Sequence, residues 1–174
     1  MKSIADTLRG GDRRSIGKSD SVVAAIERHP EYFTDLWNCL SHSDGLVRMR
    51  AADALEKLSR THAAWFAPHR KALLSWKLDD GTAELRWHLV LLAARLTLSL
   101  REAESLLRRL EVFVHEDASR IVKVMALQAA VEIGTRHPAL RNDVDRLRGW
   151  AFECPWPSVR ARARKLCKPL AGRA

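Results

Sequence analysis

The sequence predicts an all-α protein built from about four helix pairs, and two regular spacings predict it. Leucines recur every 37 residues, at Leu36, Leu73, Leu110 and Leu147. An aliphatic residue followed by a cation recurs with nearly the same period, at Val47-Arg48, Leu85-Arg86, Val122-Lys123 and Val159-Arg160. A fixed period of this length is typical of stacked helical repeats. In addition, the sequence has no alternating strand pattern and no Asn-Gly hairpin signal.

The first helix of each pair is expected over Glu31–Ser41, Ala63–Leu78, Leu100–Glu116 and Leu140–Glu153. Pro30 and Pro138 stand where two of these helices begin, which suits proline because a helix start needs no N–H there. Ser99 and Glu102 have the spacing of a capping box and mark a third start.

The second helices are expected over Gly45–Arg60, Ala83–Leu98, Arg120–Arg136 and Ser158–Leu170. Asp44 and Thr82 are suitable N-caps, and Pro157 suits a first turn. The apolar residues of the first of these helices share one face, at Val47, Ala51, Ala54, Leu55 and Leu58. One such pair cannot cover its own apolar face, so we expect the pairs to stack on their neighbours.

This pattern divides the chain into a short leading segment and one repeat domain. Residues 1–19 contain Gly10-Gly11 and Gly17 among charged residues and are expected to form a tail or a short helix. Residues 20–174 are the repeat domain, with Asp20–His29 as a lone capping helix. The repeats are predicted at about 30–60, 62–98, 99–136 and 138–170.

Two segments resemble the second helix of a HEAT repeat, Asp44–Leu55 and Pro157–Leu166. The resemblance covers roughly residues 20–170, and it departs from the usual pattern where Trp87 and His88 replace small residues. It implies a right-handed α-solenoid of about four HEAT-like helix pairs with an N-terminal capping helix, whose second helices line the concave side. HEAT-like arrays are scaffolds with many partners, so the resemblance indicates an interaction protein without naming its partner.

Composition excludes several classes of protein. The 174 residues carry 30 basic and 21 acidic side chains, a net charge of +9, with an apolar content ordinary for globular proteins. The N-terminus lacks the apolar segment of a secretory signal, and the longest uncharged apolar run, Trp87–Ala94, is too short to cross a membrane. Three cysteines without a Cys-x-x-Cys pair favour a reducing, cytoplasmic location. We expect no cofactor, no metal and no catalysis, because neither nucleophile motifs nor histidines at metal-ligand spacing occur.

The second-helix face opposite the core is the predicted binding surface for a protein or peptide partner. In the second and third repeats this face is apolar, which indicates either a contact patch or burial by neighbouring repeats. The predicted partner-binding residues are Met49, Trp87, Val90, Leu91, Ala94, Val124, Leu127 and Val131.

The last repeat is strongly basic, and nucleic acid is therefore the alternative partner. Its possible contact residues are Arg148, Arg160, Arg162, Arg164, Lys165 and Lys168, with Trp150 and Trp156 near enough to stack on bases. A solvated cap on the array would have the same composition.

Two further interpretations concern single side chains. The recurring cations, Arg48, Arg86, Lys123 and Arg160, either form a binding ladder or bond to neighbouring turns, where Asp44, Asp80 and Asp117 are available. A minor enzymatic hypothesis follows from the bacterial alkylpurine DNA glycosylases, which are HEAT-like and combine a basic groove with an acid and aromatics. Its groove residues would be Asp53, Glu56, Trp87 and Arg95.

Overall fold

The computed structural model describes residues 3–12, 15–75 and 81–167, and in these ranges it contains helices and turns but no strand. The chain divides into two compact units, Met1–Phe66 and Ala67–Ala174. The boundary lies inside one 3₁₀ segment, η3 (Ala63–His69).

The first unit contains two short helices and two longer ones. Its elements are α1 (Ile4–Leu8), α2 (Ser19–Arg28), η1 (Pro30–Tyr32), α3 (Phe33–Asn38), η2 (Cys39–Ser41) and α4 (Gly45–Leu58). Helix α4 packs against α1, α2 and α3. Phe33 closes this core, because its ring meets Phe66 edge to face with the ring centroids 5.0 Å apart.

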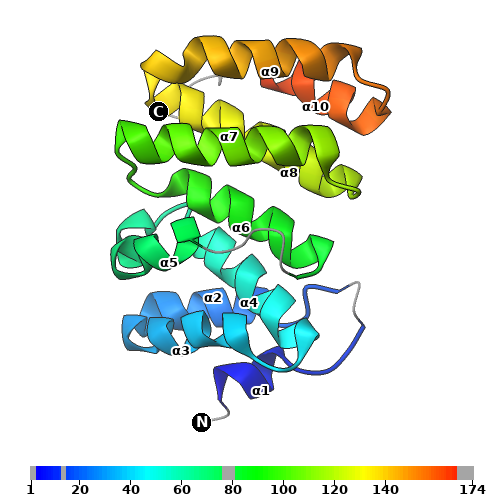
Figure 1. Cartoon of the computed structure of the whole chain (residues 1–174). Helices are drawn as coiled ribbons and strands as arrows, with labels where there is room; N and C mark the ends of the chain where they lie inside the picture. The colour runs from blue at the N-terminus through cyan, green and yellow to red at the C-terminus, as the bar shows by residue number, and fades with distance from the viewer. Residues whose placement is uncertain (1–2, 13–14, 76–80, 168–174) are drawn as a thin grey trace. The chain divides into compact units, whose positions relative to one another are not determined.

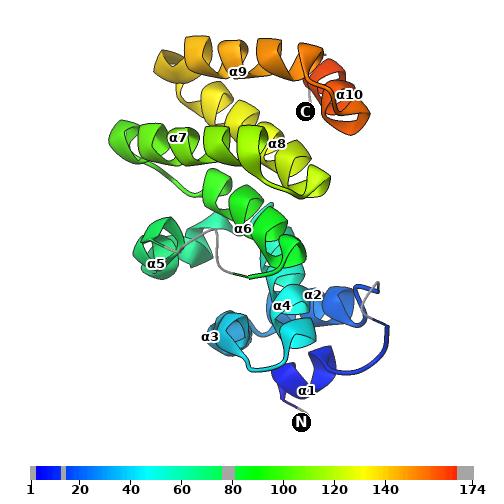
Figure 2. The same cartoon turned by 45° about the vertical axis from the view of Figure 1, so that its right-hand side comes forward.

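The second unit is a stack of helix pairs in two layers (Figures 1 and 2). Its elements are α5 (Arg70–Ser75), α6 (Ala83–Arg95), α7 (Leu100–Glu116), α8 (Arg120–Arg136), η4 (Pro138–Leu140), α9 (Arg141–Glu153) and α10 (Pro157–Leu166). The first helices α5, α7 and α9 form one layer, and the second helices α6, α8 and α10 form the other. Helix α8 is central, because it packs on α6, α7, α9 and α10.

Some predicted helix boundaries agree with the structure, whereas the helix expected over Glu31–Ser41 is divided into η1, α3 and η2, and the helix expected over Ala83–Leu98 ends at Arg95. Helices α7 and α8 begin and end at the predicted residues. The helix expected over Ala63–Leu78 is instead divided into η3 and α5, because Pro68 lacks the N–H that a continuous helix needs. The end expected for that helix, and the last residues expected in α10, lie outside the described residues.

The predicted caps are confirmed. The Asp44 carboxylate accepts a hydrogen bond from the Leu46 N–H at 2.8 Å, and the Thr82 hydroxyl accepts one from the Leu85 N–H at 3.4 Å. Ser99 and Glu102 form both bonds of a capping box. The four periodic leucines are all buried in the core.

Candidate functional site

The recurring cations donate to main-chain carbonyl groups shortly before their own helix, in the preceding turn or, for Lys123, in the last turn of α7. Arg48 donates to the His42 carbonyl, Arg86 to Gly81, Lys123 to His115 and Arg160 to Cys154, with distances between 2.7 and 2.8 Å. Asp117 accepts two hydrogen bonds from Arg86, whereas Asp44 serves as the N-cap of its own helix. Asp80 lies outside the described residues. These bonds favour the structural interpretation of the cations.

Most of the predicted partner-binding residues are buried in the structure. Val90, Leu91, Ala94, Val124 and Leu127 are each at most 9% exposed. Met49, Trp87 and Val131 are part-exposed. Neighbouring helices therefore cover much of this apolar face, for which the sequence allowed either burial or an exposed contact patch. A partner could contact only part of the predicted set without disturbing the fold.

The open side of the second-helix layer in the second unit combines apolar and polar side chains. Part-exposed and exposed residues of α8 recur at helical spacing, which places them on one stripe. We call this surface the second-helix face, and its residues are Trp87, Arg95, Ile121, Met125, Gln128, Val131, Glu132, Arg162 and Lys165. Ile121 is 44% exposed, a large value for an isoleucine in a helix.

A chain of hydrogen bonds and ion pairs fixes the polar side chains of the second-helix face. Arg95 pairs with Glu132 at 3.4 Å, and the Gln128 amide donates to Glu132 at 3.0 Å. The Gln128 amide oxygen accepts from Arg162 Nη1 at 3.2 Å. The chain thus crosses α6, α8 and α10, and it sets the orientation of the Arg162 guanidinium.

The predicted basic block is divided between internal and free cations. Arg160 and Arg162 bond within the unit, and Arg148 pairs with Asp145 at 2.6 Å. Arg164 and Lys165 are exposed on α10, and their side chains form no hydrogen bond or ion pair with the other described residues. Lys168 lies outside the described residues.

Trp150 and Trp156 belong to an aromatic cluster at one edge of the second unit. The Trp150 ring meets Trp156 at 6.1 Å and His115 at 4.2 Å between centroids. The buried Lys123 ammonium lies 4.3 Å from the centroid of the Trp156 ring. Desolvation lowers the pKa of Lys123 below its ordinary value. The Lys123 ammonium therefore occupies one face of the Trp156 ring, where a base would otherwise stack.

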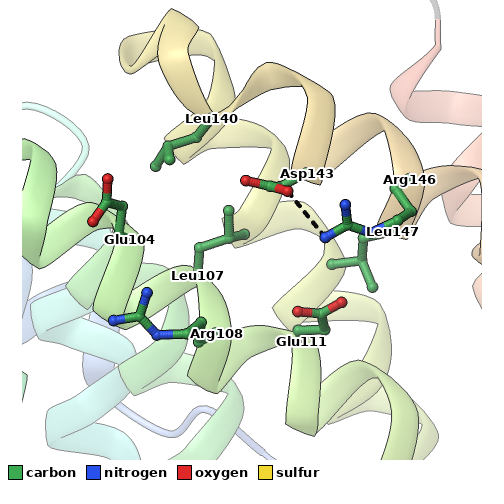
Figure 3. A pocket seen from close by; sticks show the side chains of 8 residues that line it. All are labelled: Glu104, Leu107, Arg108, Glu111, Leu140, Asp143, Arg146 and Leu147. Carbon is green, nitrogen blue, oxygen red and sulfur yellow. Dashed lines mark ion pairs between the residues drawn. The ribbon is translucent and has the colours of Figure 1, made fainter.

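A hollow of about 320 Å³ lies on the first-helix layer, between α7 and α9 (Figure 3). Its floor is apolar and its rim is charged. Leu107, Leu140 and Leu147 form the floor, and the rim carries Glu104, Arg108, Glu111, Asp143 and Arg146. Arg146 neutralises Asp143 at 2.9 Å. The mixed charges of the rim select no single class of ligand.

The acidic residues of the enzymatic hypothesis are bonded inside the first unit. Asp53 accepts a hydrogen bond from the Ser19 hydroxyl and pairs with Lys57, and Glu56 accepts from Arg60 at 2.7 Å. Both acidic residues are buried. Among the described residues, no three histidine, cysteine or acidic side chains are grouped to hold a metal ion. No described helix is both long and apolar enough to span a bilayer.

Arg50 is the residue that the sequence interpretation missed. Its side chain is 1% exposed, and its guanidinium donates to four main-chain carbonyl groups before α2. The acceptors are Leu8 at 2.7 Å, Gly10 at 2.5 Å, Asp12 at 3.0 Å and Ser15 at 3.2 Å. Gly10, Gly11 and Gly17, which lie among or just after these acceptors in the sequence, were the signal that the backbone turns closely here. Gly17, at φ +56°, leaves no room for a Cβ beside the guanidinium.

One comparison with known proteins gives a result. A family model described as HEAT repeat domain matches residues 8–168. Comparison with curated proteins and with solved structures finds no significant match.

Proposed function

Because the chain belongs to the HEAT repeat domain family, we propose that it is an interaction module that binds a protein partner on the second-helix face of its second unit. HEAT repeats generally mediate protein–protein interactions and act as scaffolds. The contact surface is the predicted layer of second helices, and its contact residues are those that are exposed or part-exposed.

The exposed Ile121 beside a fixed row of polar groups carries the proposal. Trp87, Met125 and Val131 add part-exposed apolar area to the same helices. Interfaces combine apolar anchors with positioned polar groups, and tryptophan is among the residues that most often dominate their binding energy. Val90 and Leu127, on the same two helices, are fully buried in the core.

The charges of the second-helix face favour an acidic partner. Arg95 and Glu132 neutralise each other. Arg162 is bonded only to a neutral amide among the described residues, and Lys165 is exposed. The chain as a whole carries +9, so long-range attraction also favours a negatively charged partner.

Affinity capture from a lysate of the source cells, compared across variants, tests the proposal. Ile121→Asp places a charge at the most exposed apolar side chain of the face. Val112→Asp is the matched control, because Val112 is 52% exposed on α7 in the other layer. We expect a protein captured by the wild type and by Val112→Asp to be lost with Ile121→Asp, and its purified form to bind at least tenfold more weakly.

Circular dichroism on each variant excludes unfolding as the cause of a loss. Equal capture by both variants would place the partner elsewhere and reject the second-helix face.

Nucleic-acid binding through α10 is the second candidate, and the exposed Arg164 and Lys165 favour it. Each phosphate contact that is removed should reduce the salt dependence of binding by about one unit of logarithmic slope. Fluorescence anisotropy with labelled single- and double-stranded DNA at several salt concentrations measures this slope. An unchanged slope in the Arg164→Ala, Lys165→Ala double variant would mean that these cations do not contact phosphate and only form a solvated cap on the array.

A further inference from the structure

We propose that the second-helix face binds an acidic polypeptide segment in a looped, non-helical conformation, and that Arg162 holds main-chain carbonyl groups of this segment. The inference rests on the proposed function and specifies the form of the partner. It follows from a bound segment that the first unit already contains.

Residues 8–12 and 15–20, which we call the N-terminal segment, contact one face of α4. Arg50 donates to the carbonyls of this segment. Asp53 accepts from the hydroxyl of Ser19, and Lys57 pairs with Asp20 at 2.6 Å. Three α4 side chains at helical spacing therefore bind a largely non-helical stretch of chain, with one arginine providing most of the main-chain bonds.

The same repeat positions lie on the second-helix face in α8 and α10, whereas in α6 two of them, His88 and Leu91, are buried. Arg50 stands two residues after the recurring cation Arg48, and Arg162 stands two residues after Arg160. By the same 38- and 37-residue spacings, the position of Asp53 corresponds to Gln128 on α8 and Lys165 on α10. The position of Lys57 corresponds to Arg95 on α6 and Glu132 on α8. The face that is occupied on α4 is thus the face that is open on α8 and α10.

Arg162 has the donors that this role requires. A guanidinium carries five N–H groups, and Arg162 uses one of them, toward Gln128, among the described residues. Gln128 is itself fixed by Glu132, so the guanidinium is held in place before a ligand arrives. Holding it in advance reduces the entropy cost of binding.

The second unit differs from the first at the position of Asp53. In α10 this position is Lys165, which is exposed and cationic. A segment bound by Arg162 through its carbonyls would therefore meet Lys165 with an acidic side chain. Ile121 and Met125 lie on the same stripe of α8, about two turns and one turn before Gln128, and would contact the apolar side chains of the segment.

A displayed library of 16-residue peptides, selected on the full chain, supplies the probe. The tightest enriched peptide is labelled and titrated by anisotropy against wild type, Arg162→Ala, Arg162→Met, Lys165→Ala and Arg164→Ala. Arg162→Met keeps the aliphatic stem of the side chain, and Arg164→Ala is the control on the same helix. We expect the two Arg162 variants to bind about tenfold more weakly and Arg164→Ala to bind as the wild type does.

Alanine substitutions in the peptide then separate main-chain from side-chain recognition. If Arg162 binds carbonyl groups, replacing it should weaken binding by the same factor for every alanine variant of the peptide, because alanine keeps the main chain. The cost of Lys165→Ala should vanish when one acidic residue of the peptide is replaced, because that pair is coupled.

Undiminished binding by Arg162→Ala would overturn the inference, as would a penalty that disappears with one peptide carboxylate. Failure to enrich any peptide would overturn it too. The proposed function stands or falls separately, on whether Ile121→Asp abolishes capture of a folded partner.

Discussion

Arg86 and Asp117 are joined by two hydrogen bonds, from Nε at 3.0 Å and from Nη2 at 3.2 Å to the two carboxylate oxygens. Arg86 lies near the start of α6, and Asp117 lies in the turn before α8. The Asp117 carboxylate also accepts from the Ser119 N–H at 2.7 Å. One acidic residue therefore connects the beginnings of two consecutive second helices.

Asp117→Ala should lower the free energy of unfolding by about 2 kcal/mol, because a largely buried guanidinium loses its charged partner. Urea unfolding at pH 7 measures the change. Asp145→Ala is the control, since its ion pair with Arg148 is part-exposed and should contribute at most about 0.5 kcal/mol. Equal losses in the two variants would contradict the role given to Asp117.

Two helical glycines should respond to alanine with opposite signs. A Cβ on Gly134 would lie 2.9 Å from Cγ2 of Val144, a buried β-branched side chain that cannot easily rotate away. Gly134→Ala should therefore destabilise the protein by about 1 kcal/mol, despite the better helix propensity of alanine. A Cβ on Gly149 meets nothing within 4 Å, and Gly149→Ala should stabilise by about 0.5 kcal/mol. Thermal unfolding compares them, and stabilisation by both would disprove the close approach of α8 and α9.

The capping box of α7 should make stability depend on acid pH. Hydrogen bonds from the Ser99 hydroxyl and N–H, and the nearby Arg70, lower the pKa of Glu102 below its usual value of 4.5. A lowered folded-state pKa contributes stability above the unfolded-state pKa, and this contribution is lost as pH falls through the folded-state pKa.

The stability advantage of the wild type over Glu102→Gln should therefore be full at pH 7 and decrease below about pH 4.5. Denaturant unfolding at pH 7 and at pH 3.5 gives the two differences. An advantage that grows on acidification would contradict the assignment.

Arg50 should be required to hold the N-terminal segment on α4. Arg50→Met removes bonds to four carbonyl groups and should lower the free energy of unfolding by about 3 kcal/mol. Limited trypsin digestion should then cut after Arg9 or Lys18 at least tenfold faster. Arg48→Met is the control, because Arg48 bonds the turn at His42 and Ser43 instead. Similar early cleavage in both variants would mean that the segment is held by something other than Arg50.

The sequence by itself determined the repeat. The leucine period located the core, and residues such as Asp44, Thr82 and Ser99 located the helix starts, because a cap acts within one turn of its own helix. Pro68 shows the limit of the period, since its missing N–H divides a helix that the repeat pattern predicts as continuous.

Tertiary structure alone decided which polar and apolar residues reach the surface. Trp87 and Leu127 were both predicted on the apolar face of the second helices. Trp87 is part-exposed and Leu127 is fully buried, because exposure depends on which neighbouring helix covers the side chain. Arg50 could not be assigned from the sequence, because its hydrogen bonds span 35 to 42 residues. Such bonds form only when folding brings distant backbone together, and no local spacing records them.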